Sequence, residues 1–370
     1  MSASVRELVG AYNPQSALTE ASTPPSSWYT DPGFFEFEKR SVFSASWQVI
    51  ARADQVRSPG QYATGVIGHE PIVVVRGRDG ALRGFFNVCR HHAAAVLPHA
   101  EGQVQHIRCP YHGWTYDLAG GLVLAPEFGG VADFDRNTMG LFPVQTEVWQ
   151  GWVFVKLAGG APDLEHYLGS DLRKRFECVN VEQFQWFERR LYTLHCNWKV
   201  FVDNYLDGGY HVPHIHGGLS SVLDNSAYAI ETGVRFCLQS SPISGAPSDS
   251  PTAAVRRGER ALYYWIYPNF MINIYDQVMD TNLVIPRAVD RTEVIFDYFF
   301  TDVSEAAQDK NLASIAVSEQ IQSEDVAICE SVQRGLSSRA YDTGRLSVRR
   351  EAGEHLFHRL LHADLCAALK

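Results

Sequence analysis

Two short segments, Cys89-Arg90-His91 and Cys109-Pro110-Tyr111-His112, stand seventeen residues apart and decide how the first half of this chain folds. Each segment supplies one thiol and one imidazole, so four possible metal ligands come as two matched Cys/His pairs. Structural zinc sites usually keep their cysteines in one arm and their histidines in the other. The mixed pairs therefore disfavour zinc, which remains the alternative metal.

The matched pairs are typical of a Rieske [2Fe–2S] centre, in which two Cys hold one iron and two His hold the other. Imidazole ligands raise the reduction potential of such a cluster, which can then pass single electrons onward. The glycine turn Gly120-Gly121 between apolar residues predicts a hairpin after the second pair. We expect ligands on two hairpin tips to meet at one end of a small antiparallel domain. The predicted cluster ligands are Cys89, His91, Cys109 and His112.

Length, charge and apolar runs restrict the class of protein. The 370 residues are enough for about two domains. A formal net charge of −10 argues against nucleic acid or an anionic membrane as the main partner. There is no run of about 18 apolar residues, and the N-terminus shows neither a secretory nor an Arg-rich transit pattern. The other cysteines lack disulfide spacing, and we predict a cytoplasmic protein.

The pattern of apolar residues changes along the chain. Short alternating runs such as 72–76, separated by glycine and proline, predict an antiparallel β domain. After Gly159-Gly160, strand and helix patterns mix, which indicates an α+β domain. The predicted fold class is α+β, with an antiparallel β Rieske domain over 46–158. A catalytic domain over 159–370 carries an antiparallel sheet flanked by helices, and the segment 1–45 packs on it.

Residues 203–216 contain three His and two Asp and predict a second metal site. Two His and one carboxylate on one face of an iron leave positions open for dioxygen and substrate. His211 and His216 are five residues apart, which separates them by about 140° on a straight helix. Pro213 should end the helix between them and let both reach one ion. His214, one helical turn beyond His211, is the competing ligand.

A long helix predicted over 304–336 supplies the third ligand of this site. Asp325 falls on its apolar stripe, whereas Glu324 falls on the polar side with Gln320. A carboxylate on a buried face is costly unless a positive charge compensates it, and a ferrous ion would do so. The alternative interpretation is that Asp325 merely interrupts the apolar stripe at a place where the helix is near solvent. The stripe consists of Val317, Ile321, Ile328 and Val332.

Together these motifs resemble those of Rieske-type non-haem iron oxygenases, the ring-hydroxylating oxygenase alpha-subunit family, from about Trp28 to the C-terminus. Within this family the chain is most similar to choline monooxygenase and the related quaternary-amine oxygenases. The resemblance implies two cofactors, a [2Fe–2S] Rieske cluster and a mononuclear Fe(II). The closer similarity rests on the segments 197–201, 203–207, 267–273, 323–326, 332–336 and 355–361.

The resemblance also implies a head-to-tail homotrimer in which an electron passes through His112 to the iron of the neighbouring subunit. Because the chain has no Gly-x-Gly-x-x-Gly motif, we expect a ferredoxin or flavin reductase to supply the electrons. The family usually has an acid three residues before the first iron-binding His, where this chain has Gly208. Asp207 is therefore our candidate bridge between the two metal sites, with helix capping as the alternative role. Asn204, in the same motif, is the other predicted catalytic residue.

The predicted reaction uses O2 to hydroxylate a quaternary ammonium substrate, most simply choline to betaine aldehyde hydrate. The alternatives are N-demethylation of a betaine or carnitine, and hydroxylation of an aromatic ring. An electron carrier without oxygen chemistry would leave the second metal site unexplained. A trimethylammonium group donates no hydrogen bonds and is best bound by aromatic rings. The predicted substrate-binding residues are Tyr210, Tyr264, Trp265, Tyr267 and Phe270.

Two other groups of residues are interpreted without a functional role. His355, His358 and His362 have helical spacing on the last helix, and no carboxylate or Cys is expected to converge on them. Arg256, with its neighbour Arg257, could dock an acidic ferredoxin, but charge runs are usually solvated surface.

Overall fold

The computed structural model describes residues 4–160, 162–177, 179–244 and 250–370. The chain divides into two compact units, one formed by 43–164 and the other by 1–42 together with 165–370. The limits proposed from the sequence, after 45 and after 158, lie close to these. No helix in the described parts of the chain is long and apolar enough to cross a membrane.

The 43–164 unit is built on a seven-stranded antiparallel sheet with the strand order β1-β10-β9-β4-β3-β2-β5. Its β3 strand carries the β-branched run 72–75, which is completely buried. Such residues suit a pleated surface that is covered on both sides. The strands are β1 (Gln48–Arg52), β2 (Gln61–Ile67), β3 (Glu70–Arg76), β4 (Leu82–Phe86), β5 (Glu101–Gln103), β9 (Pro143–Trp149) and β10 (Trp152–Lys156).

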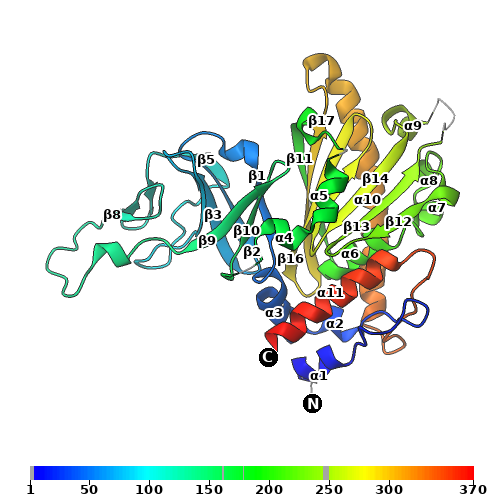
Figure 1. Ribbon diagram of the computed structural model, residues 1–370, viewed down its shortest axis with the longest axis horizontal. Coiled ribbons are helices and arrows are strands. Elements are labelled where there is room, and N and C mark those ends of the chain that lie inside the picture. The colour runs from blue at the N-terminus through cyan, green and yellow to red at the C-terminus, as the bar shows by residue number, and fades with distance from the viewer. Residues whose placement is uncertain (1–3, 161, 178, 245–249) are drawn as a thin grey trace. The chain divides into compact units, whose positions relative to one another are not determined.

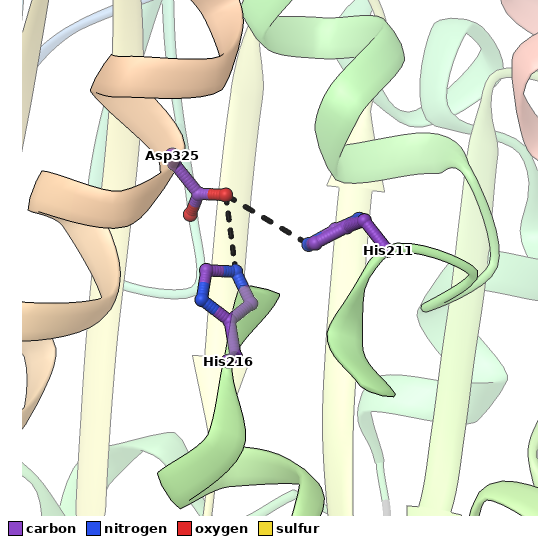
Figure 2. A group of neighbouring side chains, drawn as sticks. All are labelled: His211, His216 and Asp325. Atoms are coloured by element: carbon purple, nitrogen blue, oxygen red, sulfur yellow. Dashed lines mark hydrogen bonds and ion pairs between the residues drawn. The ribbon is translucent and has the colours of Figure 1, made fainter. Parts of the chain in front are cut away.

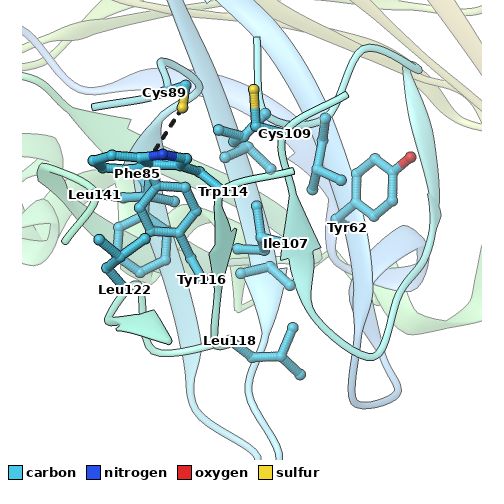
Figure 3. Close-up of a cluster of buried hydrophobic side chains, with 14 residues drawn as sticks. Tyr62, Phe85, Cys89, Ile107, Cys109, Trp114, Tyr116, Leu118, Leu122 and Leu141 are labelled. Atoms are coloured by element: carbon cyan, nitrogen blue, oxygen red, sulfur yellow. Dashed lines mark hydrogen bonds between the residues drawn. The ribbon is translucent and has the colours of Figure 1, made fainter. Parts of the chain in front are cut away.

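A smaller three-stranded sheet carries the second Cys/His pair. Its strands β6 (Ile107–Arg108), β7 (Thr115–Tyr116) and β8 (Leu122–Leu124) pair in the order β6-β7-β8. A hydrophobic cluster that includes Phe85, Trp114 and Tyr116 joins this sheet to the larger one, and both Cys89 and Cys109 belong to it (Figure 3). The cysteines of both Cys/His pairs are therefore part of the hydrophobic core of this unit.

The other unit contains a seven-stranded antiparallel sheet in the order β11-β17-β16-β15-β14-β13-β12 (Figure 1). The strands from β13 to β17 follow one another along the chain, so most connections are short. The long hairpin β16–β17 is buried along most of its length. The strands are β11 (Gln185–Leu194), β12 (Ala229–Thr232), β13 (Phe236–Pro242), β14 (Arg260–Ile266), β15 (Phe270–Ile274), β16 (Val278–Ala288) and β17 (Arg291–Phe300).

Helices of the same unit hold the N-terminal segment and the metal-binding segment in place. Helix α6 contacts α10, α11 and β16, and it is the element that leads into the segment 207–216. Lys199 of α6 forms a fully buried ion pair with Glu38 of α3, with Nζ and Oε2 2.8 Å apart. The helices are α1 (Val5–Gly10), α2 (Ser27–Thr30), α3 (Pro32–Glu38), α5 (Ser170–Phe176), α6 (Trp198–Leu206), α7 (Val212–Ile215), α8 (Gly217–Ser220), α9 (Pro251–Val255), α10 (Gln308–Leu336) and α11 (Ala352–Ala368), with α4 (Leu164–Leu168) at the boundary of the units.

The predicted apolar stripe of α10 is wrong in part. Ile328 and Val332 are 37% and 44% exposed. The buried face instead carries hydroxyl and amide groups that have specific partners. Gln333, for example, accepts a hydrogen bond from the backbone N–H of Asn197 at 2.8 Å. The buried residues of α10 are Asn311, Ser314, Ile315, Ser318, Gln322, Cys329, Gln333 and Leu336.

Candidate metal centres and the adjacent cavity

A tight turn after α6 directs the second metal-binding segment. Gly208 and Gly209 have φ values of +68° and +65°, a region that favours glycine. A Cβ atom at Gly208 would lie 2.1 Å from the carbonyl oxygen of Arg350, so no larger residue fits there. The Asp207 carboxylate accepts hydrogen bonds from the backbone N–H of His211 at 3.0 Å and of Tyr210 at 3.1 Å. The turn therefore fixes where the next side chains point.

Two imidazoles and one carboxylate converge below this turn (Figure 2). The Nε2 atom of His216 lies 3.1 Å from Oδ1 of Asp325, and the Nε2 atom of His211 lies 3.8 Å from the same oxygen. His211 and His216 flank α7 as its two caps. The prediction that Pro213 ends a helix between them was wrong, because α6 already ends at Leu206 and Pro213 lies in the first turn of α7. Asp325 is in the middle of α10. The three ligand atoms lie within 4.8 Å of one another, a spacing that one metal ion can bridge.

Each of these imidazoles is also oriented by a second carboxylate. The Nδ1 atom of His211 lies 2.6 Å from Oδ2 of Asp207, and the Nδ1 atom of His216 lies 2.7 Å from Oε2 of Glu324. Metal-binding histidines almost always donate their second N–H in this way, which leaves Nε2 as the ligand. The donor set thus fits a mononuclear iron held by two His and one carboxylate.

Glu324 was missed from the sequence, because its polar position on α10 indicated only solvent exposure. Its side chain is 28% exposed, and Gln320 donates a hydrogen bond to Oε1 at 2.8 Å. Burial lowers the pKa of His216, but its hydrogen bonds to Asp325 and Glu324 outweigh burial and raise that pKa above 6.5. The sequence signal that could have identified Glu324 is its position directly before Asp325, a predicted ligand.

Two further predicted residues have clear positions. Asn204, on α6, donates a hydrogen bond from Nδ2 to Oδ1 of Asp325 at 2.9 Å. The competing ligand His214 is exposed and its ring lies beside Tyr210, with centroids 6.3 Å apart. The structure therefore brings Asn204 to the triad and places His214 away from it.

The two Cys/His loops of the other unit have the same backbone structure. In each, the cysteine N–H donates to the carbonyl five residues on, and the cysteine carbonyl accepts from the N–H four residues on. That fourth residue, Ala93 or Gly113, has a positive φ of 59° or 74°. Cys89 and Cys109 are 3% and 2% exposed. Each loop therefore presents one thiol and one imidazole, and the two turns have the same hydrogen-bond pattern.

The imidazoles of these loops approach one another, which fits a shared cluster. The rings of His91 and His112 have centroids 4.8 Å apart. The Nδ1 atom of His91 is buried and has no hydrogen-bond partner among the described residues. A buried ring nitrogen without a partner is costly unless something binds it. Two buried thiols and two histidines are the donor set of a Rieske [2Fe–2S] centre.

A cavity of about 120 Å³ adjoins the triad, and six aromatic side chains form part of its wall. It contains one buried carboxylate, Asp280, which is 3% exposed and accepts hydrogen bonds from Asn273 at 2.7 Å and Asn282 at 3.2 Å. Burial raises the pKa of Asp280, and the nearby guanidinium of Arg256 opposes this. The aromatic residues in the wall are Phe201, Tyr205, Tyr228, Tyr263, Tyr275 and Phe296.

Arg256, interpreted as solvated surface, is instead 3% exposed and lines the same cavity. It donates hydrogen bonds to the hydroxyls of Ser314 at 2.7 Å and Ser318 at 2.5 Å on α10. Its Nε atom is buried without a partner among the described residues. The prediction that Arg256 is exposed was wrong, because it relied on charge alone and the residue points inward at the end of α9.

None of the five predicted substrate-binding residues lines this cavity. Tyr264 points to the other face of β14, where it packs on Phe176 with ring centroids 4.5 Å apart. Trp265 and Tyr267 pack on each other and lie in the core, and Tyr267 donates a hydrogen bond to Asp364 at 2.7 Å. Phe270 is also fully in the core, and Tyr210 is 52% exposed. Two other aromatic residues of the same segment, Tyr263 and Tyr275, line the cavity instead.

The interpretation of His358 as a residue without carboxylate neighbours was also wrong. Its Nε2 atom lies 2.9 Å from Oδ1 of Asp203 and 3.9 Å from Oε1 of Glu354. Asp203 comes from α6, 155 residues earlier in the chain, so the spacing on the last helix gave no sign of it. These three side chains form a second group whose ligand atoms lie within 4.8 Å of one another.

The two family models that match the chain cover both units. One is described as Rieske [2Fe-2S] domain and matches residues 46–135. The other is described as ring hydroxylating alpha subunit (catalytic domain) and matches residues 181–365. Together they include every metal-binding candidate of the two centres.

Curated relatives match nearly the whole chain. A protein named choline monooxygenase, chloroplastic, from Arabidopsis thaliana is 40% identical over 98% of this chain and 87% of its own length. A carnitine monooxygenase oxygenase subunit from Escherichia coli (strain K12) is 33% identical over 89% of this chain and 87% of its own length.

Solved structures agree with this fold. A quaternary ammonium Rieske monooxygenase in complex with L-carnitine is 30% identical, with a TM-score of 0.81 over 96% of each chain. Naphthalene 1,2-dioxygenase from Rhodococcus sp., at 21% identity and a TM-score of 0.79 over 93% of this chain and 94% of its own, shares the fold alone.

Proposed function

Because this chain belongs to the Rieske-type ring-hydroxylating oxygenase alpha-subunit family, we propose that it uses O2 to hydroxylate a small quaternary ammonium compound, with choline as the preferred substrate. The alcohol carbon of choline gains one oxygen atom and becomes betaine aldehyde hydrate. The second oxygen atom is reduced to water, and this reduction consumes two electrons and two protons. We further propose that a ferredoxin or flavin reductase supplies the electrons and that the working form is a homotrimer.

The observation that carries this proposal is the buried carboxylate in an aromatic cavity beside the metal triad. A trimethylammonium head is attracted to aromatic faces by about 0.5–2 kcal/mol per ring. Asp280 adds a negative charge that two Asn amides keep in place, with Oδ1 at 2.7 Å from Asn273. The cavity, of about 120 Å³, is lined by the triad itself, so a small cation bound there would lie next to the proposed iron site.

The metal-binding residues take separate parts in the reaction. When bound, the [2Fe–2S] cluster supplies single electrons and the mononuclear iron supplies the activation of dioxygen. Cys89, His91, Cys109 and His112 would hold the former, and His211, His216 and Asp325 would hold the latter. The protein's own contribution is to place the alcohol carbon beside the triad and to exclude water with the aromatic wall.

Asp207 and Asn204 are proposed as positioning residues. Asp207 holds the Nδ1 side of His211 at 2.6 Å, and Asn204 donates to Asp325 at 2.9 Å. In protein saturated with Fe²⁺, so that weaker metal binding does not interfere, changing Asp207 to Asn should slow the transfer of electrons between the two centres. Single-turnover kinetics of the pre-reduced enzyme measure this rate, and an unchanged rate would place the bridge elsewhere.

A second candidate is an N-demethylating oxygenase of a betaine- or carnitine-type substrate. Arg256 favours it, because its buried guanidinium group lies in the wall of the cavity and would attract a substrate carboxylate. In that case the attacked carbon is a methyl group next to nitrogen, and the products are formaldehyde and a tertiary amine.

The test is product formation by the reduced, iron-loaded protein with choline, glycine betaine, carnitine and a simple aromatic acid. Betaine aldehyde from choline supports the first proposal, and formaldehyde from a betaine supports the second. A hydroxylated aromatic product, with no reaction of the amines, would overturn both.

A variant tests the role of the buried carboxylate directly. Changing Asp280 to Asn should cost about 2–5 kcal/mol of choline binding, because the cation loses its buried partner. The corresponding rise in KM is about 30-fold or more, whereas the exposed Asp290 changed to Asn should leave KM unchanged. Equal KM values for the Asp280→Asn variant and the parent protein would remove this residue from the site.

A further inference from the structure

The group formed by Asp203, Glu354 and His358 has nearly the same spacing as the iron triad. Its imidazole nitrogen lies 2.9 Å and 3.9 Å from the two carboxylate oxygens. In the triad, the two imidazole nitrogens lie 3.1 Å and 3.8 Å from the Asp325 oxygen. Such separations allow three atoms to bind one ion after small movements, because metal–ligand bonds are about 2.0–2.2 Å long.

Glu354 is a buried carboxylate that lacks adequate compensation. It is 7% exposed, and no hydrogen bond reaches it from the described part of the chain. Its contact with His358, at 3.9 Å, is too long for a hydrogen bond. Burial, and then the neighbouring carboxylates of Asp203 and Glu351, raise the pKa of Glu354 well above its ordinary range. A bound cation would remove this electrostatic cost.

There is room for an ion beside the group. A cavity of about 210 Å³, separate from the one next to the triad, is lined by Asp203, Glu354 and Tyr29. The Tyr29 hydroxyl lies 2.7 Å from Oδ2 of Asp203 and 3.3 Å from Nε2 of His358, and it offers a fourth ligand atom, an oxygen. The buried amine nearby, that of Lys199, is already paired with Glu38 at 2.8 Å.

We propose that Asp203, Glu354 and His358 form a second metal-binding site, which takes a divalent first-row cation such as Mn²⁺. Two carboxylates suit Mn²⁺, and one imidazole is compatible with it. The ion would join α6 to α11 and, through Tyr29, to α2. Its role is to fix the helix that leads into the iron-binding segment and to hold the N-terminal segment on the same unit.

The experiment is a titration of full-length protein with Mn²⁺, in which the loss of the free Mn²⁺ EPR signal measures binding. The Asp325→Ala variant provides the background, because it lacks a carboxylate of the mononuclear site. We expect one Mn²⁺ per chain in Asp325→Ala and at least tenfold weaker binding in Asp325→Ala with Glu354→Gln. An added exposed control, Asp309→Asn, should leave the affinity unchanged.

The thermal transition gives a second readout, which does not depend on substrate or turnover. Mn²⁺ should raise the Tm of Asp325→Ala, because a ligand of the native state stabilises it by mass action. It should leave the Tm of the variant that also carries Glu354→Gln unchanged. No bound Mn²⁺ in Asp325→Ala, or binding that Glu354→Gln does not weaken, would overturn the proposal and leave a purely hydrogen-bonded cluster.

Discussion

Glu324 contacts a proposed iron ligand from its outer side, and we predict that it strengthens metal binding without contacting the metal. Its carboxylate lies 2.7 Å from Nδ1 of His216, on the side of the ring away from Asp325. Loss of such an outer carboxylate typically lowers metal affinity by 10–100-fold. We therefore expect Glu324→Gln to bind Fe²⁺ about 10–100-fold more weakly, as measured by competition with a chelator. Glu319→Gln, on the same helix, is the matched control, and equal loss in both variants would contradict the assignment.

The raised pKa of His216 gives the iron site a defined dependence on pH. Fe²⁺ binds only the neutral ring, so protons compete with the metal. Because the pKa of His216 lies above 6.5, this competition should begin at a higher pH than for an ordinary histidine. We expect Fe²⁺ affinity to fall as the pH drops through this pKa. Without iron, the protonated ring stabilises the fold below pH 6.5, and this stabilisation is lost as the pH rises through the raised pKa.

Equilibrium dialysis of Fe²⁺ between pH 6 and pH 8 measures the first effect, and urea unfolding of the metal-free protein measures the second. An Fe²⁺ affinity that did not change over this range would exclude control by His216.

Residue types and spacing were sufficient to predict which three side chains converge in the triad, but not which aromatic residues line the adjacent cavity. His211 and His216 stand in one short segment, and Asp325 was recognised because a carboxylate on a helix face needs compensation. The choice between Tyr263 and Tyr264 depends on which face of β14 meets the cavity. Neighbouring residues of a strand face opposite sides, so a shift of one position exchanges cavity for core. Which of the two residues faces the cavity is set by the packing of the sheet and cannot be predicted from a run of aromatic residues.

At the level of helices, the fully buried ion pair between Glu38 of α3 and Lys199 of α6 links the N-terminal segment to the helix that leads into residues 207–216. Burial raises the pKa of Glu38 and lowers that of Lys199, and their mutual attraction opposes both shifts. Removing one partner leaves a buried charge alone, which costs about 3–5 kcal/mol. We expect Lys199→Met to lower the free energy of unfolding by this amount, measured by urea denaturation.

The double variant Glu38→Leu with Lys199→Met separates the charge from the packing. Replacing a whole buried pair by apolar residues is often neutral or stabilising, so it should recover most of the loss. A double variant as unstable as Lys199→Met would mean that packing around Lys199, rather than its charge, is what matters.

Helix α10 illustrates why an element can be predicted more reliably than its face. Its length follows from a long helical pattern, and it begins at Gln308 because Glu305–Ala307 forms a separate turn. Its buried side could not be predicted, because it is lined by Ser314 and Ser318, which bind Arg256. Buried polar groups require partners, and these partners come from distant segments. Apolar periodicity alone therefore pointed to a stripe that is partly exposed.

For the whole molecule, the division into two units predicts that the two metal centres can be removed separately. Asp325→Ala should lose the mononuclear iron but keep the visible absorption of the cluster, because the cluster ligands and their core belong to residues 43–164. Cys89→Ser should do the reverse. Iron and sulfide analysis together with absorption spectra measure both outcomes. Loss of both metals in Asp325→Ala would show that the two units do not fold independently.

The order in which the iron ligands occur along the chain affects how the enzyme is made. Asp207 and His211 stand four residues apart and meet within one turn, whereas His216 and Asp325 meet across 109 residues. A ribosome that has just added His216 has yet to synthesise β12 to β17 and the whole of α10, which carries Asp325. During that time the emerging segment offers a metal only part of its final ligands. The complete ligand set therefore exists only after the large sheet and α10 have been made, so iron insertion follows their synthesis.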